Sequence, residues 1–236
     1  MSRGTQNTVL LLVGLSAAVM VFKGSYLHYV KPSLLPWLVA AAVVLVVLAV
    51  TAIVSDLRHG SHHPADDGHR HRSWPGWLLV VPIAFITFVV PPPIGARGAT
   101  PEAVAAAQPQ RRPFPPLPAG PAPAVSLPDL VMRAAADSTN SLDGRRVTVT
   151  GFTLKYPQGT DLGRVVIVCC AADAQLARIH LSGPGEAEVS GYPEDTWLQL
   201  EGQLVPGTSV PSSNFIPTVA VKSVQRIDKP ANTYTY

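Results

Sequence analysis

The pattern of apolar and polar positions divides the chain into an oily first part and a globular last part. Three long apolar runs come first, at residues 5–22, 34–54 and 77–94. The middle run contains no charged residue and has the length of a helix that crosses a bilayer. The sequence therefore predicts a transmembrane region over residues 1–94, with three spanning helices.

Two of these runs have a second interpretation. The first could be a secretory signal peptide, although no small-residue cleavage site precedes Lys23. The third is short, carries Pro82 and ends at Pro91, which cannot continue a helix. A buried soluble helix or a re-entrant segment is the alternative for this third run.

The basic residues of the short loops predict the orientation. The loop between the second and third runs carries Arg58, Arg70 and Arg72, and the N-terminus carries Arg3. The positive-inside rule places both in the cytoplasm. Three spans then put the C-terminal part outside the cytoplasm, whereas two spans would leave it inside. We expect a multi-pass protein of the cell membrane with an extracytoplasmic C-terminal domain.

The same loop is rich in histidine. Five of the seven histidines of the chain lie within residues 59–71. Neutral imidazoles bind zinc and other divalent transition metals, and a short histidine-rich tract is a compositional signal for metal binding. The alternative is a solvated polar loop. The spacing fits a loose metal site rather than a closed one; its candidate ligands are His59, His62, His63, His69 and His71.

Proline and charge change the picture further. Residues 95–125 are rich in proline and alanine and lack apolar periodicity, which predicts a linker that holds the last domain away from the membrane. A ligand for a proline-recognition domain is the alternative. Charged residues make up only 14% of the chain, a deficit that indicates membrane burial. The net charge of +3, without a basic cluster, argues against nucleic-acid binding.

Residues 126–236 read as a soluble, β-rich domain. Ser126 is a typical helix cap, followed by proline in the first turn and an acid at Asp129. Five short strands follow; they include the alternating stretches around Val147, Ile179 and Leu200 and the continuous apolar run at 165–170. The predicted fold is membrane-anchored α plus β, with one leading helix and a small OB-like barrel or curved sheet.

Cys169 and Cys170, the only cysteines, end that apolar run, and Asp173 follows them. A disulfide between neighbouring residues would be strained. Within a strand one thiol would face the core and the other a ligand, because successive side chains alternate. Three interpretations remain: core packing, metal or thiol chemistry completed by a group such as His180, and contact with a partner.

Several stretches of this domain resemble a known family. The run from Arg164 to Ala174, the strand at 147–152 and the segment at 197–202 resemble the YcgQ-like bacterial proteins, described as subunits of a two-component permease. The resemblance implies a polytopic permease partner that carries the transport path, and leaves the substrate open. The matching residues are Gly151, Phe152, Cys169, Cys170, Ala172, Asp173, Trp197 and Gly202.

Together these features predict an accessory subunit of a membrane permease, embedded in the lipid bilayer, with no catalysis of its own. Three spans without intramembrane charges are too few to build a transport path. The domain would bind the partner, or a metal ion or other small substrate, through the Cys169–Asp173 edge. The alternatives are a thiol-redox protein, which lacks a Cys-x-x-Cys motif, and a metal-collecting or metal-sensing protein. No hydrolytic signature is present.

Overall fold

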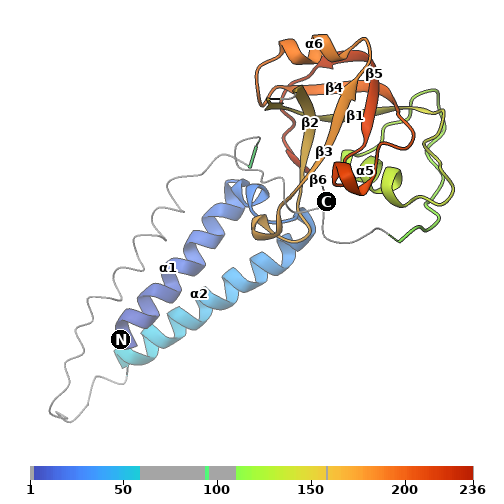
Figure 1. Cartoon of the computed structure of the whole chain (residues 1–236). Helices are drawn as coiled ribbons and strands as arrows, with labels where there is room; N and C mark the ends of the chain where they lie inside the picture. Colours follow the sequence, from blue (N-terminus) through green and yellow to red (C-terminus); the bar gives the residue numbers. More distant parts are fainter. Residues whose placement is uncertain (1–2, 59–93, 96–109, 158, 236) are drawn as a thin grey trace. The chain divides into compact units, whose positions relative to one another are not determined.

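A computed structural model describes residues 3–58, 94–95, 110–157 and 159–235 (Figure 1). It divides into two compact units, residues 1–92 and 93–236. Among the described residues, the first contains two long helices, and the second contains a curved sheet with two helices.

The N-terminal unit is a helical hairpin. Helix α1 (Arg3–Phe22) and helix α2 (Leu35–Arg58) lie side by side (Figure 1). Gly14 of α1 allows close approach, since a Cβ there would lie 2.8 Å from the Val46 side chain of α2. Near the open end of the hairpin, the Asn7 amide donates a 3.0 Å hydrogen bond to the Asp56 carboxylate. The helices are therefore antiparallel and in contact along their length.

Among the described residues, one helical stretch is long and apolar enough to cross a bilayer. It covers Pro32–Arg58, which joins the short helix η2 (Pro32–Leu34) to α2. The apolar part of α1, Gln6–Phe22, is shorter. An apolar helix near the N-terminus can serve as an anchor or as a signal. The described residues contain one candidate span and therefore do not support the expected three. The third predicted run lies outside the described residues except for Ile94.

The C-terminal unit begins with helix α5 (Leu127–Ala136), as the sequence predicted. The Ser126 hydroxyl accepts a 3.3 Å hydrogen bond from the Asp129 amide, and Pro128 occupies the first turn. Six strands follow in one sheet: β1 (Arg146–Tyr156), β2 (Gly159–Val166), β3 (Gln175–Ser182), β4 (Trp197–Leu204), β5 (Thr218–Arg226) and β6 (Tyr234–Thr235). The unit is thus a mixed α/β fold.

The strand pairings run in a closed circuit, from β1 to β4, β5, β3, β2 and back to β1. The β3–β5 pair is parallel, and the other four pairs of the circuit are antiparallel. The short β6 adds a parallel pairing to β2. Because β1 pairs with both β2 and β4, the sheet is strongly curved.

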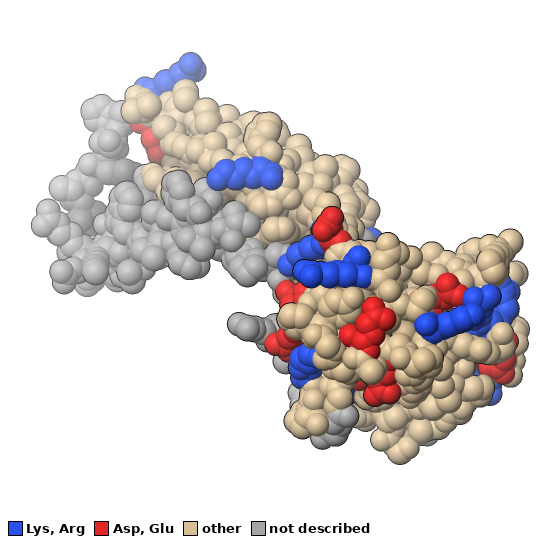
Figure 2. Space-filling view, turned by 90° about the horizontal axis from the view of Figure 1, so that it is seen from above, with Lys and Arg blue, Asp and Glu red and all other residues tan. Residues whose placement is uncertain are grey.

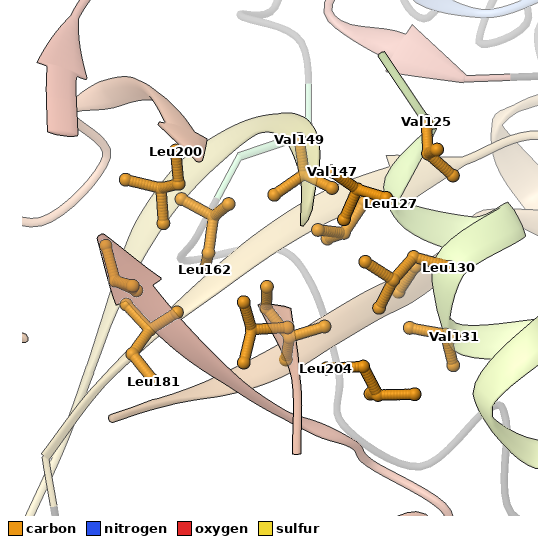
Figure 3. Close-up of a cluster of buried hydrophobic side chains, with 14 of the residues drawn as sticks. Val125, Leu127, Leu130, Val131, Val147, Val149, Leu162, Leu181, Leu200 and Leu204 are labelled. Carbon is orange, nitrogen blue, oxygen red and sulfur yellow. The ribbon is translucent and has the colours of Figure 1, made fainter. Parts of the chain in front are cut away.

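The main core fills the concave side of this sheet, where α5 packs on the strands. Figure 3 shows Leu127, Leu130 and Val131 of α5 directed at strand side chains such as Val149 and Leu162. A smaller cluster surrounds Tyr234 on the opposite face of β2 and β3, as the alternation of side chains requires. Its members are Phe152, Leu154, Val165, Ile167, Leu176, Trp197 and Tyr234.

Three elements differ from the sequence prediction. Strand β2 begins at Gly159 and ends at Val166, so the strand expected at 165–170 stops before the cysteines. The short helix α6 (Glu186–Gly191) and strand β6 were not predicted. Elements of six residues (α6) and two residues (β6) are too short to show an apolar period in the sequence.

Much of the predicted linker is folded onto the domain. The Arg112 amide donates to the Ala136 carbonyl at 2.8 Å, and Arg112 accepts in turn from the Ser138 amide. Further along, the Val125 amide donates to the Thr148 carbonyl at 2.9 Å. Residues 110–125 are therefore part of the C-terminal unit, and residues 96–109 of the predicted linker lie outside the described residues.

Ile94 is also attached to this unit. Its amide donates a 2.8 Å hydrogen bond to the Tyr234 hydroxyl, and its side chain packs on the smaller cluster. The Tyr234 side chain is buried, which makes it a fixed anchor. The two ends of the C-terminal unit thus meet at one tyrosine.

Asp137, at the end of α5, holds the turn against which the proline-rich segment packs. Its buried carboxylate accepts hydrogen bonds from the amide and hydroxyl groups of Thr139 and Ser141. Burial alone would raise the pKa of Asp137, but these hydrogen bonds outweigh it and hold the pKa well below the ordinary 3.8. The turn is therefore stabilised by the charged form of the carboxylate.

Asp137→Asn should lower the free energy of unfolding of the full chain by about 1–3 kcal/mol at pH 7, because two hydrogen-bond donors then face an amide nitrogen. Since the folded pKa is depressed, the stabilisation is fully present above the unfolded pKa and is lost as the pH falls toward the folded value. The difference between wild type and variant should shrink below about pH 4. Chemical unfolding in detergent measures it.

Asp143→Asn is the matched control, since Asp143 is exposed and lies in the same connection between α5 and β1. It should unfold like the wild type across this pH range. Equal stability of all three proteins at pH 7 would contradict the role assigned to Asp137.

Candidate functional site

The loop after β2 is built around the carboxylate of Asp173. Oδ1 accepts a 2.9 Å hydrogen bond from the Val168 amide, and Oδ2 accepts from the Cys169 amide at 2.8 Å and the Cys170 amide at 3.3 Å. Three successive amides are thus used by one side chain from the short helix η4 (Ala171–Asp173) and are withdrawn from strand pairing. This competition explains why β2 ends at Val166.

Both cysteines are free thiols at the surface of this loop. Cys169 is exposed and Cys170 is half-buried. Residues 167–169, which lead to this pair, are not part of a strand. One thiol was expected to face the core if the pair lay within the strand. The pair lies beyond the strand end, and neither thiol is buried. Next to them the Val168 side chain is 63% exposed. The loop presents two thiols and an aliphatic side chain to the solvent.

Hydrogen bonding keeps the Cys169 thiol protonated by raising its pKa. Chiefly the hydrogen bond to Asp173, and then the one with Cys170, raises the pKa of Cys169 to about 11. The same thiol contact, together with the backbone amides, lowers the pKa of Asp173 to about 2. At neutral pH the loop therefore holds an ionised carboxylate next to a neutral thiol.

The three side chains form one cluster of metal-ligating groups. The sulfur atoms of Cys169 and Cys170 and a carboxylate oxygen of Asp173 all lie within 4.8 Å of one another. Thiolates prefer soft or borderline ions such as Cu(I) and Zn(II), but a closed zinc site needs four ligands. No fourth ligand joins them among the residues the structure describes. The cluster can therefore contribute part of a metal site.

His180 is not at this cluster. The β2–β3 ladder pairs Val166 with Gln175 next to the thiol loop, but it pairs Asp161 with His180 five residues further along. There the His180 Nδ1 atom lies 2.8 Å from an Asp161 oxygen. The structure brings Cys169, Cys170 and Asp173 together and places His180 in a second, separate group.

That second group contains residues that the sequence did not single out. Arg178 lies 3.7 Å from the other oxygen of Asp161 and covers the ring of Tyr156. The alternation of β3 placed Arg178 and His180 on one face, which was a usable signal. No signal in the sequence pointed to Asp161, because its place next to His180 depends on the register between β2 and β3.

The histidine loop stays a prediction. His59, His62, His63, His69 and His71 all lie outside the described residues. Among the described residues, Figure 2 shows acidic and basic side chains interspersed over the visible face of the C-terminal unit. That face carries no extended basic patch of the kind that binds nucleic acid.

These features define a mixed α/β domain that displays a two-thiol loop and is joined to an apolar N-terminal helix. Residues 130–236 match a known family, described as the DUF1980 C-terminal domain. The match covers the thiol loop and every residue that carries the resemblance noted above. No curated protein and no solved structure matches the chain.

Asp173→Asn should lower the pKa of Cys169 toward that of an ordinary thiol, because the charged hydrogen-bond acceptor is gone. In a Cys170→Ala background, alkylation of Cys169 at pH 8 should become at least about tenfold faster, in proportion to the thiolate fraction. The pH dependence of iodoacetamide labelling of the full chain in detergent measures this change.

Asp228→Asn, in the same background, removes an exposed acid elsewhere on the domain and should leave the labelling rate unchanged. Equal rates for the Asp173 variant and its parent across pH 7–10 would show that the carboxylate does not control the thiol.

Proposed function

We propose that this chain is a membrane-anchored accessory subunit of a two-component permease, in the manner of the YcgQ-like proteins. Its C-terminal domain, an OB-like barrel, binds the polytopic partner through the Cys169–Asp173 loop. The loop presents two thiols to a metal ion or another small ligand that the partner transports. The permease, not this chain, carries the transport path.

One observation carries the proposal: the thiol loop is exposed and offers an incomplete ligand set. Two sulfur atoms and one carboxylate leave a tetrahedral ion one ligand short, and the exposed Val168 offers an apolar contact beside them. A partner that supplies the remaining ligand would bind both the ion and the loop. The match of residues 130–236 to the DUF1980 C-terminal domain is consistent with the YcgQ-like resemblance of the same residues.

The pKa of Cys169 separates this proposal from the thiol-redox alternative. Redox and nucleophilic cysteines have lowered pKa values, because the thiolate is the reacting species. Asp173 has the opposite effect and raises the pKa of Cys169 to about 11. A bound metal ion displaces the proton by its own charge, so metal binding does not need a preformed thiolate.

The membrane anchor of the proposal consists of α1, α2 and the predicted third span. Aliphatic side chains of α2 such as Val43 and Val47 are 55% and 52% exposed, as lipid-facing residues would be. We propose a multi-pass arrangement that places the C-terminal domain outside the cytoplasm, following the basic residues of the loops.

Val43→Arg combined with Val47→Arg tests the anchor. Each arginine at the centre of a span costs about 2.5–3.5 kcal/mol of insertion free energy. The double variant should therefore lose retention of the full chain in carbonate-washed membranes, while Val43→Leu with Val47→Leu should keep it. Wild-type protein in the aqueous fraction without detergent would overturn the anchor.

Photocross-linking tests the partner. A thiol-linked photoreactive group on Cys169, in a Cys170→Ala background, should capture one polytopic membrane protein in native membranes. The same group on Ser223→Cys, an exposed position of β5 in a cysteine-free background, should not. Equal capture from both positions, or a solitary monodisperse chain after mild solubilisation, would contradict the permease proposal.

A further inference from the structure

The polar group around Asp161 forms a second site that the proposed function does not use. Asp161, Arg178 and His180 lie on the face of β2 and β3 opposite the main core, because Leu162 and Ile179 point into that core. At one end of this face the smaller apolar cluster is packed under Tyr234. At the other end lies a pocket of about 480 Å³.

Asp161 is a buried charge with few compensating contacts. Its side chain is 8% exposed, and Oδ2 accepts no hydrogen bond from the described residues. Only Arg178, at 3.7 Å, and His180, at 2.8 Å, offset the cost of burying this carboxylate. Apolar residues in such a position often make a fold as stable or more stable, so the charged group indicates function rather than stability.

The carboxylate positions two hydrogen-bond donors at the pocket. Asp161 engages Nδ1 of His180, so Nε2 lies on the far side of a ring that is 41% exposed. The Arg178 guanidinium rests 4.9 Å from the centre of the Tyr156 ring and makes no hydrogen bond to any described residue. Its N–H groups are held in place and available, and both residues line the pocket.

The charges of the pocket favour an anion. Asp161 lines the pocket, but its side chain is only 8% exposed, and its two oxygens lie next to His180 (2.8 Å) and Arg178 (3.7 Å). The other lining acid, Glu186, is exposed, where water screens it. The Lys155 ammonium adds positive charge beside the pocket, since it donates a 3.1 Å hydrogen bond to Thr160.

We propose that this pocket binds a small oxyanion, a carboxylate or phosphate group, between Arg178 and His180. A planar guanidinium fixed on an aromatic ring offers parallel donors that match two oxygens of such a group. The imidazole supplies a further donor, and Asp161 is a positioning residue that orients both. This site is independent of the thiol loop and of the permease partner.

The test is calorimetric titration of the full chain in neutral detergent with inorganic phosphate and, separately, with acetate at constant ionic strength. Saturable binding of one anion is expected, and the tighter anion assigns the ligand to the phosphate or carboxylate class. Arg178→Gln should weaken binding at least about tenfold, a loss of 1.4 kcal/mol. Arg178→Lys, which keeps the charge without the fork, should fall in between.

Arg226→Gln is the control. Arg226 is an exposed arginine at the end of β5, whereas Thr218 at the start of β5 pairs with His180. This variant should leave the affinity unchanged. His180→Gln serves as a second variant on a half-exposed side chain, should Arg178→Gln fail to fold, and is also expected to weaken binding. No saturable binding of either anion, or equal affinity in the wild type and both pocket variants, would overturn the proposal.

Discussion

Strand β1 hydrogen-bonds to two partners, β2 and β4, and this double pairing determines the shape of the C-terminal unit. A sheet that returns to its first strand must curve until its strands approach closely. A Cβ at Gly151 would lie 2.5 Å from the Gly163 carbonyl oxygen, and one at Gly202 would lie 2.7 Å from that of Ala220. Glycine is required at both positions because nothing larger fits between the strands. The thiol loop and the group around Asp161 lie at opposite ends of the β2–β3 ladder of this sheet.

Carboxylate side chains accept hydrogen bonds from the backbone just after two regular elements of this domain. Asp137 after α5 and Asp173 after β2 each accept backbone amides, and accepted hydrogen bonds lower both pKa values. At Asp137 the bonds from Ser141 and Thr139 outweigh burial, and at Asp173 the Cys169 thiol has the largest effect. Asp161 is different, because within the described part of the chain it accepts no backbone amide and pairs only with the side chains of His180 and Arg178. The first two acids are therefore explained by folding, whereas the third requires another explanation.

The sequence predicted the elements better than their ends. Apolar periodicity and the Ser126 cap located α5, and alternation located three strands, since both signals are local. The end of β2 depends on a hydrogen bond from Cys169 to Asp173, four residues away, which competes with the ladder and leaves no mark in the apolar pattern. The group around His180 depends on the register between two strands, which only the folded chain fixes. For the thiol site, the sequence identified Cys169, Cys170 and Asp173, which lie together, but it also included His180, which lies in the second group. For the second site, the sequence indicated only the face of β3 that carries Arg178 and His180.

The protonated state of the thiol loop has a consequence for the proposed function. An ion that binds Cys169 must displace the thiol proton, which is hydrogen-bonded to Asp173, so its affinity falls below that of a free thiolate pair and rises with pH. At a structural metal site, this penalty would weaken metal binding. A site that receives an ion and passes it to a permease benefits, because release must be as feasible as capture. The Asp173 carboxylate that ends β2 would thus also keep the ligand exchangeable, which links the local backbone structure to the proposed role in transport.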